Sequence, residues 1–308
     1  MKIAVLGAGA MGSLFAAKLS ACHDVLILDL NAARIDAIKA EGIHVMEQDG
    51  SVLKGYPPAS LPKDAAGEYD LVLVFVKAMF TKAALEGIKQ IISPKTKLLT
   101  LQNGGGHEDV LSQFVPMENV LIGTTQHNAS VREGGSIHHG GSGVTVIGNL
   151  AGNDAAAQEV VDAFAQAGFD MKVSENVRKA VWQKLMTNVS LSALTGVFKM
   201  PLGFVTRSES AWKLCEILIR EACAVAKADG VEFDVEDKIE EVRKVSVNGP
   251  MGITSICADL QNGRMTEVDT ISGSVVRAAK RLGMEAPHHE MMVMLIHAFE
   301  DKNRINKQ

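Results

Sequence analysis

The sequence has no long hydrophobic run, no excess of positive charge and no low-complexity segment. Its longest apolar run, Leu71 to Val76, is much too short to cross a bilayer, so we expect no membrane partner. The net charge of −5 argues against a nucleic-acid surface or a polybasic membrane patch. No charged segment followed by an apolar one precedes the first expected strand, which predicts the absence of a signal peptide.

Cysteine is also scarce, and the four present are not spaced like metal ligands: Cys22, Cys215, Cys223 and Cys257. This pattern predicts reduced thiols in a cytoplasmic protein and no metal site. The neighbouring His138 and His139 lie in a glycine-rich stretch. Because no third ligand accompanies them, we expect a solvated turn there rather than a metal centre.

Residues 2–12 predict a dinucleotide-binding turn, because a short apolar strand runs directly into G-x-G-x-x-G and a helix-prone segment follows. Gly7 permits a sharp turn, Gly9 lets a pyrophosphate approach the backbone, and Gly12 lets the helix pack closely. The alternative is a glycine-rich turn without a ligand. The candidate cofactor-binding residues of this turn are Gly7, Ala8, Gly9, Ala10, Met11 and Gly12.

Polar residues follow three further expected strands. Asp29 ends the second strand, where a carboxylate accepts hydrogen bonds from the adenosine ribose and repels a 2′-phosphate. The alternative is that Asp29 only helps to cap the next helix. Lys77 and the segment 102–106 stand at the carboxyl ends of two other strands, where open α/β sheets place their ligands.

The distribution of strand and helix signals predicts two domains. Strands alternate with helices up to residue 173, and only helical periodicity follows. We therefore expect a Rossmann-type α/β domain with a mostly parallel, doubly wound sheet over 1–173, and an all-α domain over 174–308. Single helices are expected over 80–92 and again from Thr266, after a break at 262–263. Apolar stripes in the helical domain would suit a homodimer, which the sequence does not decide.

A polar row crosses an otherwise apolar helical segment. Lys184, Asn188 and Ser192 stand at i, i+4 and i+8 on one face, without the additional charges of a solvated face. A partly buried lysine beside a nicotinamide can attract an anionic substrate or protonate an alkoxide. Further along, Ser255 could bind a carboxylate oxygen and Glu267 could accept from a substrate hydroxyl, although structural roles stay open for both.

Taken in order, the motifs of the whole chain resemble those of the ketopantoate reductases (2-dehydropantoate 2-reductases). They are GAGAMG at 7–12, VKA at 76–78, QNG at 102–104, GTT at 123–125, W-x-K-L-x-x-N at 182–188 and S-x-x-x-D-x-x-x-x-R-x-T-E-V-D at 255–269. The resemblance implies a fold of the 6-phosphogluconate-dehydrogenase type. It also implies NAD(P)H-dependent reduction of a small anionic 2-keto acid, ketopantoate, to pantoate on the route to pantothenate and coenzyme A.

The resemblance also implies a role for each candidate site residue. Lys184 is the general acid, and Glu267 is the carboxylate that orients the substrate. Substrate contacts are expected from Asn103, Asn188, Ser192 and Ser255. Cofactor contacts outside the glycine turn are expected from Asp29, Lys77, Asn103 and Glu267.

Two departures from the family pattern concern Ser192 and the end of the second strand. Ser192 replaces an asparagine that is frequent in the family, so one substrate hydrogen bond is expected to be shorter or water-mediated. NADPH-using members usually have a basic residue where this chain has Asp29, and some have a polar residue at Phe80. Both changes favour NADH, unless Arg34 or Lys77 binds the 2′-phosphate. Two other functions stay open: reduction of another small 2-keto or 3-hydroxy acid, and nicotinamide sensing without turnover.

Overall fold

The computed structural model describes residues 1–306, which form two compact units. The first unit has two stretches, and the second has a short loop and the C-terminal part: Met1–Gln102 with His107–Ala180, and Asn103–Gly106 with the chain from Val181 onward. The last strand ends at Val173, the predicted boundary, but the units divide later, within helix α6 (Val177–Thr187). Residues 307 and 308 of the predicted helical domain lie outside the described residues.

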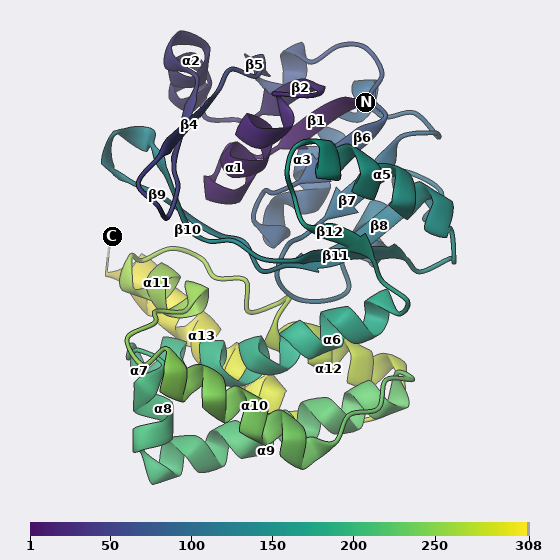
Figure 1. Ribbon diagram of the computed structural model, residues 1–308. Coiled ribbons are helices and arrows are strands. Elements are labelled where there is room, and N and C mark those ends of the chain that lie inside the picture. The colour runs from purple at the N-terminus through teal and green to yellow at the C-terminus, as the bar shows by residue number, and fades with distance from the viewer. Residues whose placement is uncertain (307–308) are drawn as a thin grey trace. The chain divides into compact units, whose positions relative to one another are not determined.

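An eight-stranded sheet forms the centre of the first unit, in the order β12-β11-β8-β7-β6-β1-β2-β5 (Figure 1). Its strands are β1 (Lys2–Leu6), β2 (Asp24–Leu28), β5 (Ala59–Ser60), β6 (Leu71–Val74), β7 (Lys97–Thr100), β8 (Val120–Thr125), β11 (Thr145–Asn149) and β12 (Met171–Val173). All neighbours pair in parallel except β8 and β11. The predicted Rossmann-type sheet, mostly parallel, is confirmed, and the structure adds the antiparallel strand β11 near one edge.

Helices and a smaller sheet complete this unit. The helices are α1 (Ala10–Leu19), α2 (Ala32–Glu41), α3 (Thr81–Glu86), α4 (Glu108–Leu111) and α5 (Asp154–Gln166). The small sheet has the order β4-β3-β10-β9, with β3 (Ile43–Met46), β4 (Val52–Gly55), β9 (Asn128–Val131) and β10 (Ile137–Gly141). Phe15 of α1 packs in the same core as Ile3 and Val5 of β1. Burial of central strands on both faces explains their continuous apolar runs.

The helix predicted over 80–92 is wrong in its length. Only α3 is α-helical, and it lies between two short 3-10 turns, η2 (Ala78–Phe80) and η3 (Lys89–Ile91). Gly87 directly follows the last residue of α3. Glycine loses more backbone entropy in a helix than other residues do, which explains an early end there.

The prediction of a solvated turn at His138 and His139 is also wrong. Both residues lie in β10, and His139 is buried. The His139 ring lies 2.9 Å from His127 (Nε2 to Nδ1) and 2.5 Å from Glu47 (Nδ1 to Oε2). Burial lowers the pKa of His127 to about 4. These long-range partners hold the buried His139, while Nε2 of the half-buried His127 has no hydrogen-bond partner among the described residues. A local glycine-rich pattern does not reveal such contacts.

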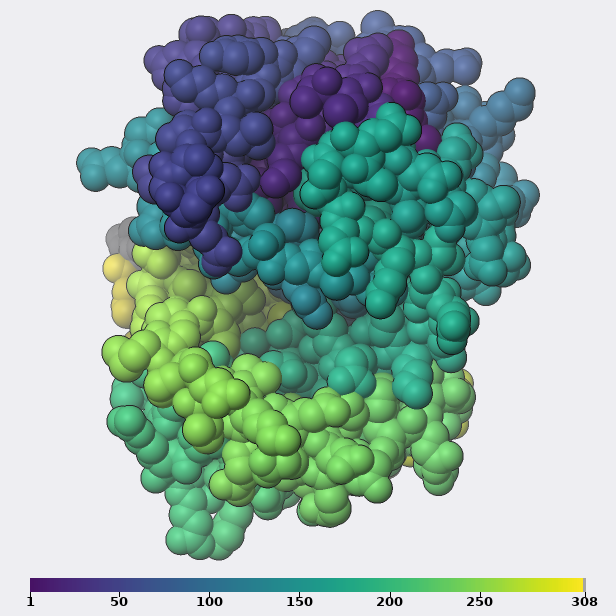
Figure 2. Space-filling view, in the orientation of Figure 1, coloured from purple at the N-terminus to yellow at the C-terminus, as the bar shows by residue number. Residues whose placement is uncertain are grey.

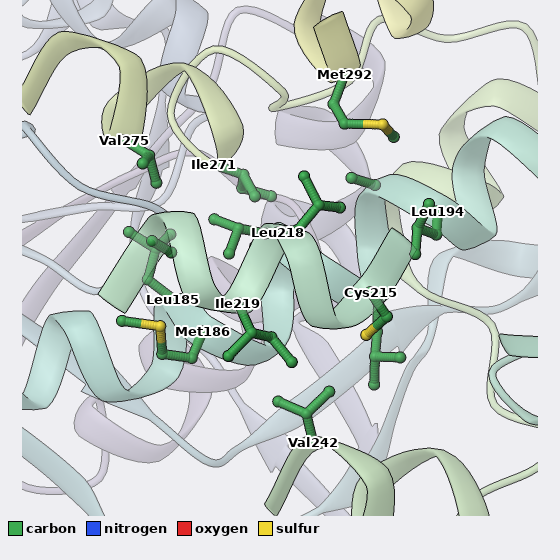
Figure 3. Packing of buried hydrophobic residues seen from close by; sticks show 14 of the residues in the cluster. Leu185, Met186, Leu194, Cys215, Leu218, Ile219, Val242, Ile271, Val275 and Met292 are labelled. Atoms are coloured by element: carbon green, nitrogen blue, oxygen red, sulfur yellow. The ribbon is translucent and has the colours of Figure 1, made fainter. Parts of the chain in front are cut away.

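The second unit is all-α, as predicted. Its helices are α6, the π-helical turn η6 (Asn188–Ser192), α7 (Ala193–Phe198), α8 (Gly203–Arg207), α9 (Glu209–Ala228), α10 (Val235–Asn248), α11 (Ser255–Gln261), α12 (Ser272–Arg281) and α13 (Pro287–Ile305). Leu218 and Ile219 of α9 lie at the centre of its core, close to Leu185 and Met186 of α6 (Figure 3). Figure 2 shows the green α10 at the surface of this unit.

Candidate functional site

The predicted glycine turn joins β1 to α1, and its three glycines stand in different surroundings. Gly7 has a φ of 110°, and a Cβ there would lie 2.7 Å from the backbone nitrogen of Val76. A Cβ on Gly12 would lie 1.9 Å from the carbonyl oxygen of Gly7. A Cβ on Gly9 would meet no protein atom within 4 Å. The fold itself therefore requires Gly7 and Gly12, whereas Gly9 borders open space of the kind that a pyrophosphate needs.

Helix α1 begins without a side-chain cap, because its N-cap is Gly9, and no acid stands in its first turn. Uncapped N–H groups at a helix start carry partial positive charge and bind phosphate groups well. The Asp29 carboxylate lies beside this turn, since its Oδ2 accepts from the Ala8 N–H at 2.7 Å. Its Oδ1 accepts from the Asn31 N–H at 2.8 Å, while Asn31 itself caps α2. Each carboxylate oxygen keeps capacity for one more hydrogen bond, as a ribose would require.

Gln102 ties together the ends of two neighbouring strands. Its Nε2 donates to the Val76 carbonyl at 2.5 Å and to the Thr81 hydroxyl at 2.9 Å. Its Oε1 accepts from the Thr100 hydroxyl at 2.7 Å. Lys77 directly follows Val76 at the carboxyl end of β6, so this amide fixes the start of the Lys77 loop. Sequence reasoning singled out a polar amide here but missed its positioning role, because the partners are distant in the chain.

The loop that carries Asn103 is fastened to the helical unit. The Gly105 N–H donates to the Thr270 carbonyl at 2.9 Å, and the Arg277 guanidinium donates to the Gly105 carbonyl at 3.3 Å. Gly104 has a φ of 105°, and a Cβ there would lie 2.0 Å from the Thr270 oxygen. The structure thus groups Asn103 with Lys184, Asn188, Ser192, Ser255 and Glu267 in one unit.

Lys184 stands on α6 beside the core of the second unit. Its neighbours in sequence, Leu185 and Met186, point into that core (Figure 3), while Lys184 itself is half-buried. Burial lowers the pKa of Lys184 to about 8, and the negative charge of Glu267 acts in the opposite direction. An ammonium group with this pKa can give up its proton near neutral pH, which is what a general acid requires.

The π-helical turn η6 keeps the predicted polar row aligned. An α-helix has about 3.6 residues per turn, so a step of four residues overshoots one turn. A π-helix bonds residue i to i+5 and has a wider turn, so the same step falls short of one turn. The angular offset around the helix axis between Lys184 and Asn188 is therefore reversed between Asn188 and the buried Ser192. The Ser190 hydroxyl donates to the Met186 carbonyl at 2.7 Å, which competes with the backbone bonds at this point.

The remaining two candidates lie around α11. Ser255 is the exposed first residue of this helix, and Thr254 is its N-cap. Glu267 is half-buried in the segment between α11 and α12. The helix predicted to restart near Thr266 is wrong, because α12 begins at Ser272. The preceding residues are held instead by side chains of α12 and α13.

The described part of the chain contains neither a cluster of metal ligands nor a membrane-spanning helix. Within residues 1–306, no three His, Cys, Asp or Glu side chains are grouped in a way that could hold a metal ion. None of the helices in this range combines the length and apolar character of a membrane span.

Comparison with known proteins identifies the family. Residues 3–152 match the family model "Ketopantoate reductase PanE/ApbA", and residues 176–300 match the model of its C-terminal part. The 2-dehydropantoate 2-reductase of Streptococcus pyogenes is 34% identical over 303 residues, which cover 97% of this chain and 98% of that protein. The enzyme of the same name from Halobacterium salinarum is 31% identical over 307 residues, or 99% and 98% of the two chains.

Two solved structures show the same fold over their full length. A D-mandelate dehydrogenase in ternary complex with NADH and anilino(oxo)acetate has a TM-score of 0.91 at 31% identity, covering 99% of this chain and 100% of that one. A PanE/ApbA family ketopantoate reductase from Ralstonia eutropha JMP134 has a TM-score of 0.87 at 30% identity, with coverage of 99% and 100%. The sequence motifs, the fold and these matches agree: the chain belongs to the ketopantoate reductase family.

Proposed function

We propose that this protein reduces ketopantoate to pantoate with NAD(P)H. The observation that carries the proposal is the half-buried Lys184, whose pKa is lowered to about 8 and whose charge interacts with Glu267. Ketopantoate has a carboxylate, a keto group and a hydroxyl. It therefore needs a cation, a proton donor and a hydrogen-bond acceptor, and the pair of Lys184 and Glu267 supplies all three.

The residues of the helical unit divide the chemical work. Lys184 donates a proton to the keto oxygen as negative charge develops there, and so stabilises the transition state. Glu267 accepts a hydrogen bond from the substrate hydroxyl and orients the molecule. The other proposed substrate contacts are Asn103, Asn188, Ser192 and Ser255. When bound, NAD(P)H supplies the hydride.

A second candidate function is the reduction of an aromatic 2-keto acid. The similarity to a D-mandelate dehydrogenase favours it, because mandelate is an aromatic 2-hydroxy acid. Mandelate lacks the additional hydroxyl of pantoate. Glu267 distinguishes the two, since a half-buried acceptor is useful only to the substrate that has this hydroxyl.

The substrate proposal is tested by kcat/KM for ketopantoate and phenylglyoxylate with the purified protein. We expect ketopantoate to be preferred at least about tenfold, which corresponds to about 1.4 kcal/mol. Glu267→Gln should lower kcat/KM for ketopantoate and leave kcat/KM for phenylglyoxylate unchanged, so the preference for ketopantoate becomes smaller. A higher kcat/KM for phenylglyoxylate would establish the second function, and no oxidation of NADH or NADPH with either acid would indicate a sensor.

The cofactor is proposed to bind the Gly7–Gly12 turn, with its adenosine ribose on Asp29 and a contact to Lys77. Additional contacts are proposed from Asn103 and Glu267. The Arg34 guanidinium, the alternative donor to a 2′-phosphate, already donates to the Gly135 carbonyl at 2.8 Å and the Ser13 hydroxyl at 3.1 Å. A carboxylate near the ribose and an occupied guanidinium both favour NADH.

We expect kcat/KM for NADH to exceed that for NADPH about tenfold or more, because Asp29 repels the 2′-phosphate. Asp29→Asn is the matched variant, since the amide oxygen can still accept from the Ala8 N–H. It should lose most of the discrimination and about 1 kcal/mol of stability, because its NH2 group replaces one of the two oxygens that accept from the Ala8 and Asn31 N–H groups. A clear preference of the unmodified protein for NADPH would contradict the assignment.

A homodimer is proposed on the basis of apolar side chains exposed on α9 and α13: Leu214, Ile217, Met291, Met294 and Leu295. Exposed apolar groups that gather on one face commonly mark an interface between proteins. Light scattering should give twice the chain mass of 32.9 kDa. A cytoplasmic location is proposed because the cysteines are free thiols, and the exposed Cys22 among them would be open to oxidation in an oxidising compartment.

A further inference from the structure

The segment between α11 and α12, which carries Glu267, is held by two side chains of α13. The Thr266 N–H donates to Glu300 Oε1 at 2.7 Å, directly before Glu267. His297 lies 2.8 Å from Glu300 (Nδ1 to Oε2) and 3.1 Å from Asp269 (Nε2 to Oδ1). The chain Glu300–His297–Asp269 therefore holds the backbone on both sides of Glu267.

The other end of the segment is held by α12 and by the core. The Arg277 guanidinium donates to the Asp269 carbonyl at 2.7 Å, and the Thr270 carbonyl accepts from the Gly105 N–H at 2.9 Å. Ile271 is fully buried and lies in the hydrophobic cluster of this unit (Figure 3). Within the turn, the Glu267 carbonyl accepts from the N–H groups of Thr270 and Ile271 at 3.1 and 3.0 Å. His297 adds a link between the two side chains that flank this turn, Glu300 and Asp269.

The chemistry of His297 suits a clamp between two carboxylates. Both ring nitrogens of an imidazolium donate hydrogen bonds, so one ring can serve two acceptors at once. Burial lowers the pKa of His297, but hydrogen bonds to Glu300 and Asp269 outweigh this effect and raise it. The Glu300 side chain is only 10% exposed. Removal of the ring would leave this carboxylate without its cation, which is costly for a buried charge.

We propose that His297 is a positioning residue, which holds Glu267 in the orientation that binds the substrate hydroxyl. The inference rests on the proposed role of Glu267. His297 acts through Glu300 and Asp269 and has no contact of its own with the substrate. Loss of His297 should loosen the turn and thereby weaken binding of the keto acid. Cofactor binding should change less, because the Gly7–Gly12 turn is not involved and only the proposed Glu267 contact is.

A double-mutant cycle tests the coupling of His297 to Glu267. His297→Ala should raise KM for ketopantoate about tenfold and raise KM for NAD(P)H much less, through the proposed Glu267 contact alone. Glu267→Gln should raise KM for ketopantoate by at least as much. In the double variant, KM should equal that of Glu267→Gln, because the clamp has nothing left to position.

The pH profile supplies a second readout. The charge of Glu267 raises the pKa of Lys184. Displacement of Glu267 in His297→Ala should therefore lower this pKa and move the alkaline decline of kcat/KM to lower pH. If His297 only stabilised the fold, His297→Ala would lower the melting temperature without moving the alkaline decline of kcat/KM. If the alanine variant does not fold, His297→Gln keeps one donor and should show the same changes in smaller size.

The matched control is His288→Ala on the same helix. His288 also pairs with a carboxylate, 2.6 Å from Glu221 (Nδ1 to Oε2), but this partner lies on α9 and not in the Glu267 segment. This variant should leave KM for ketopantoate unchanged. If the two substitutions raise KM for ketopantoate independently, their fold-changes multiply in the double variant. That result would overturn the proposed role of His297 and leave the role of Glu267 standing. An unchanged KM in Glu267→Gln would overturn both the inference and the proposed role of Glu267.

Discussion

Lys184→Ala is expected to lower kcat for ketopantoate reduction by about 10²–10⁴-fold, the usual contribution of a positioned proton donor. The variant should still bind NAD(P)H, because the glycine turn and Asp29 belong to the other unit. Loss of the cation should also weaken the anionic substrate, so KM for ketopantoate should rise. Stopped-flow and steady-state measurements of NADH oxidation, together with cofactor titration by fluorescence, provide the test.

Lys238→Ala is the control for this substitution. Lys238 is another buried lysine of the helical unit, and its ammonium group donates to Gln183 at 2.7 Å and to Glu241 at 2.5 Å. Its removal should lower the melting temperature but leave kcat within about twofold, since the role is structural. A normal kcat in Lys184→Ala would dispose of the general-acid role.

Gly9→Ala is expected to weaken cofactor binding and leave the fold intact, whereas Gly12→Ala is expected to destabilise the fold. A Cβ on Gly9 meets no protein atom within 4 Å, and the residue has an ordinary φ of −70°. Gly9→Ala should therefore fold normally and raise KM for NAD(P)H about tenfold or more, because the methyl group occupies the space of the phosphates. A Cβ on Gly12 would lie 1.9 Å from the Gly7 oxygen. Gly12→Ala should cost about 1–3 kcal/mol of stability or more.

Thermal unfolding measured with and without cofactor separates the two cases. Gly9→Ala should keep the melting temperature of the free protein and lose most of the stabilisation that NADH provides. Gly12→Ala should already melt earlier without cofactor. Equal cofactor stabilisation in Gly9→Ala and the unmodified protein would show that the phosphates bind elsewhere.

The architecture could largely be predicted from local sequence patterns. Continuous apolar runs such as Leu71 to Val74 are typical of buried parallel strands, and the structure has them there. Asn31 and Asn153 cap α2 and α5, a signal that lies within a few residues of each helix start. The row of Lys184, Asn188 and Ser192 follows from helical spacing alone.

The features that sequence reasoning missed depend on contacts between distant residues. His139 is buried in β10 because Glu47 and His127 satisfy its ring, and neither lies near it in the chain. The segment around Thr266 is held by residues of α13, since Glu300 accepts the Thr266 N–H and His297 bridges Glu300 to Asp269. The π-turn at Asn188–Ser192 leaves the polar pattern intact, so periodicity does not distinguish it from an α-helix.

The alkaline limb of kcat/KM for ketopantoate tests most directly the claim that Lys184 is the proton donor. Because burial lowers the pKa of this lysine to about 8, the protonated, active form is lost as the pH rises through that value. We expect kcat/KM to be level near neutral pH and to fall about tenfold per pH unit above about pH 8 to 9. A kcat/KM that stays level up to pH 10 would contradict the account.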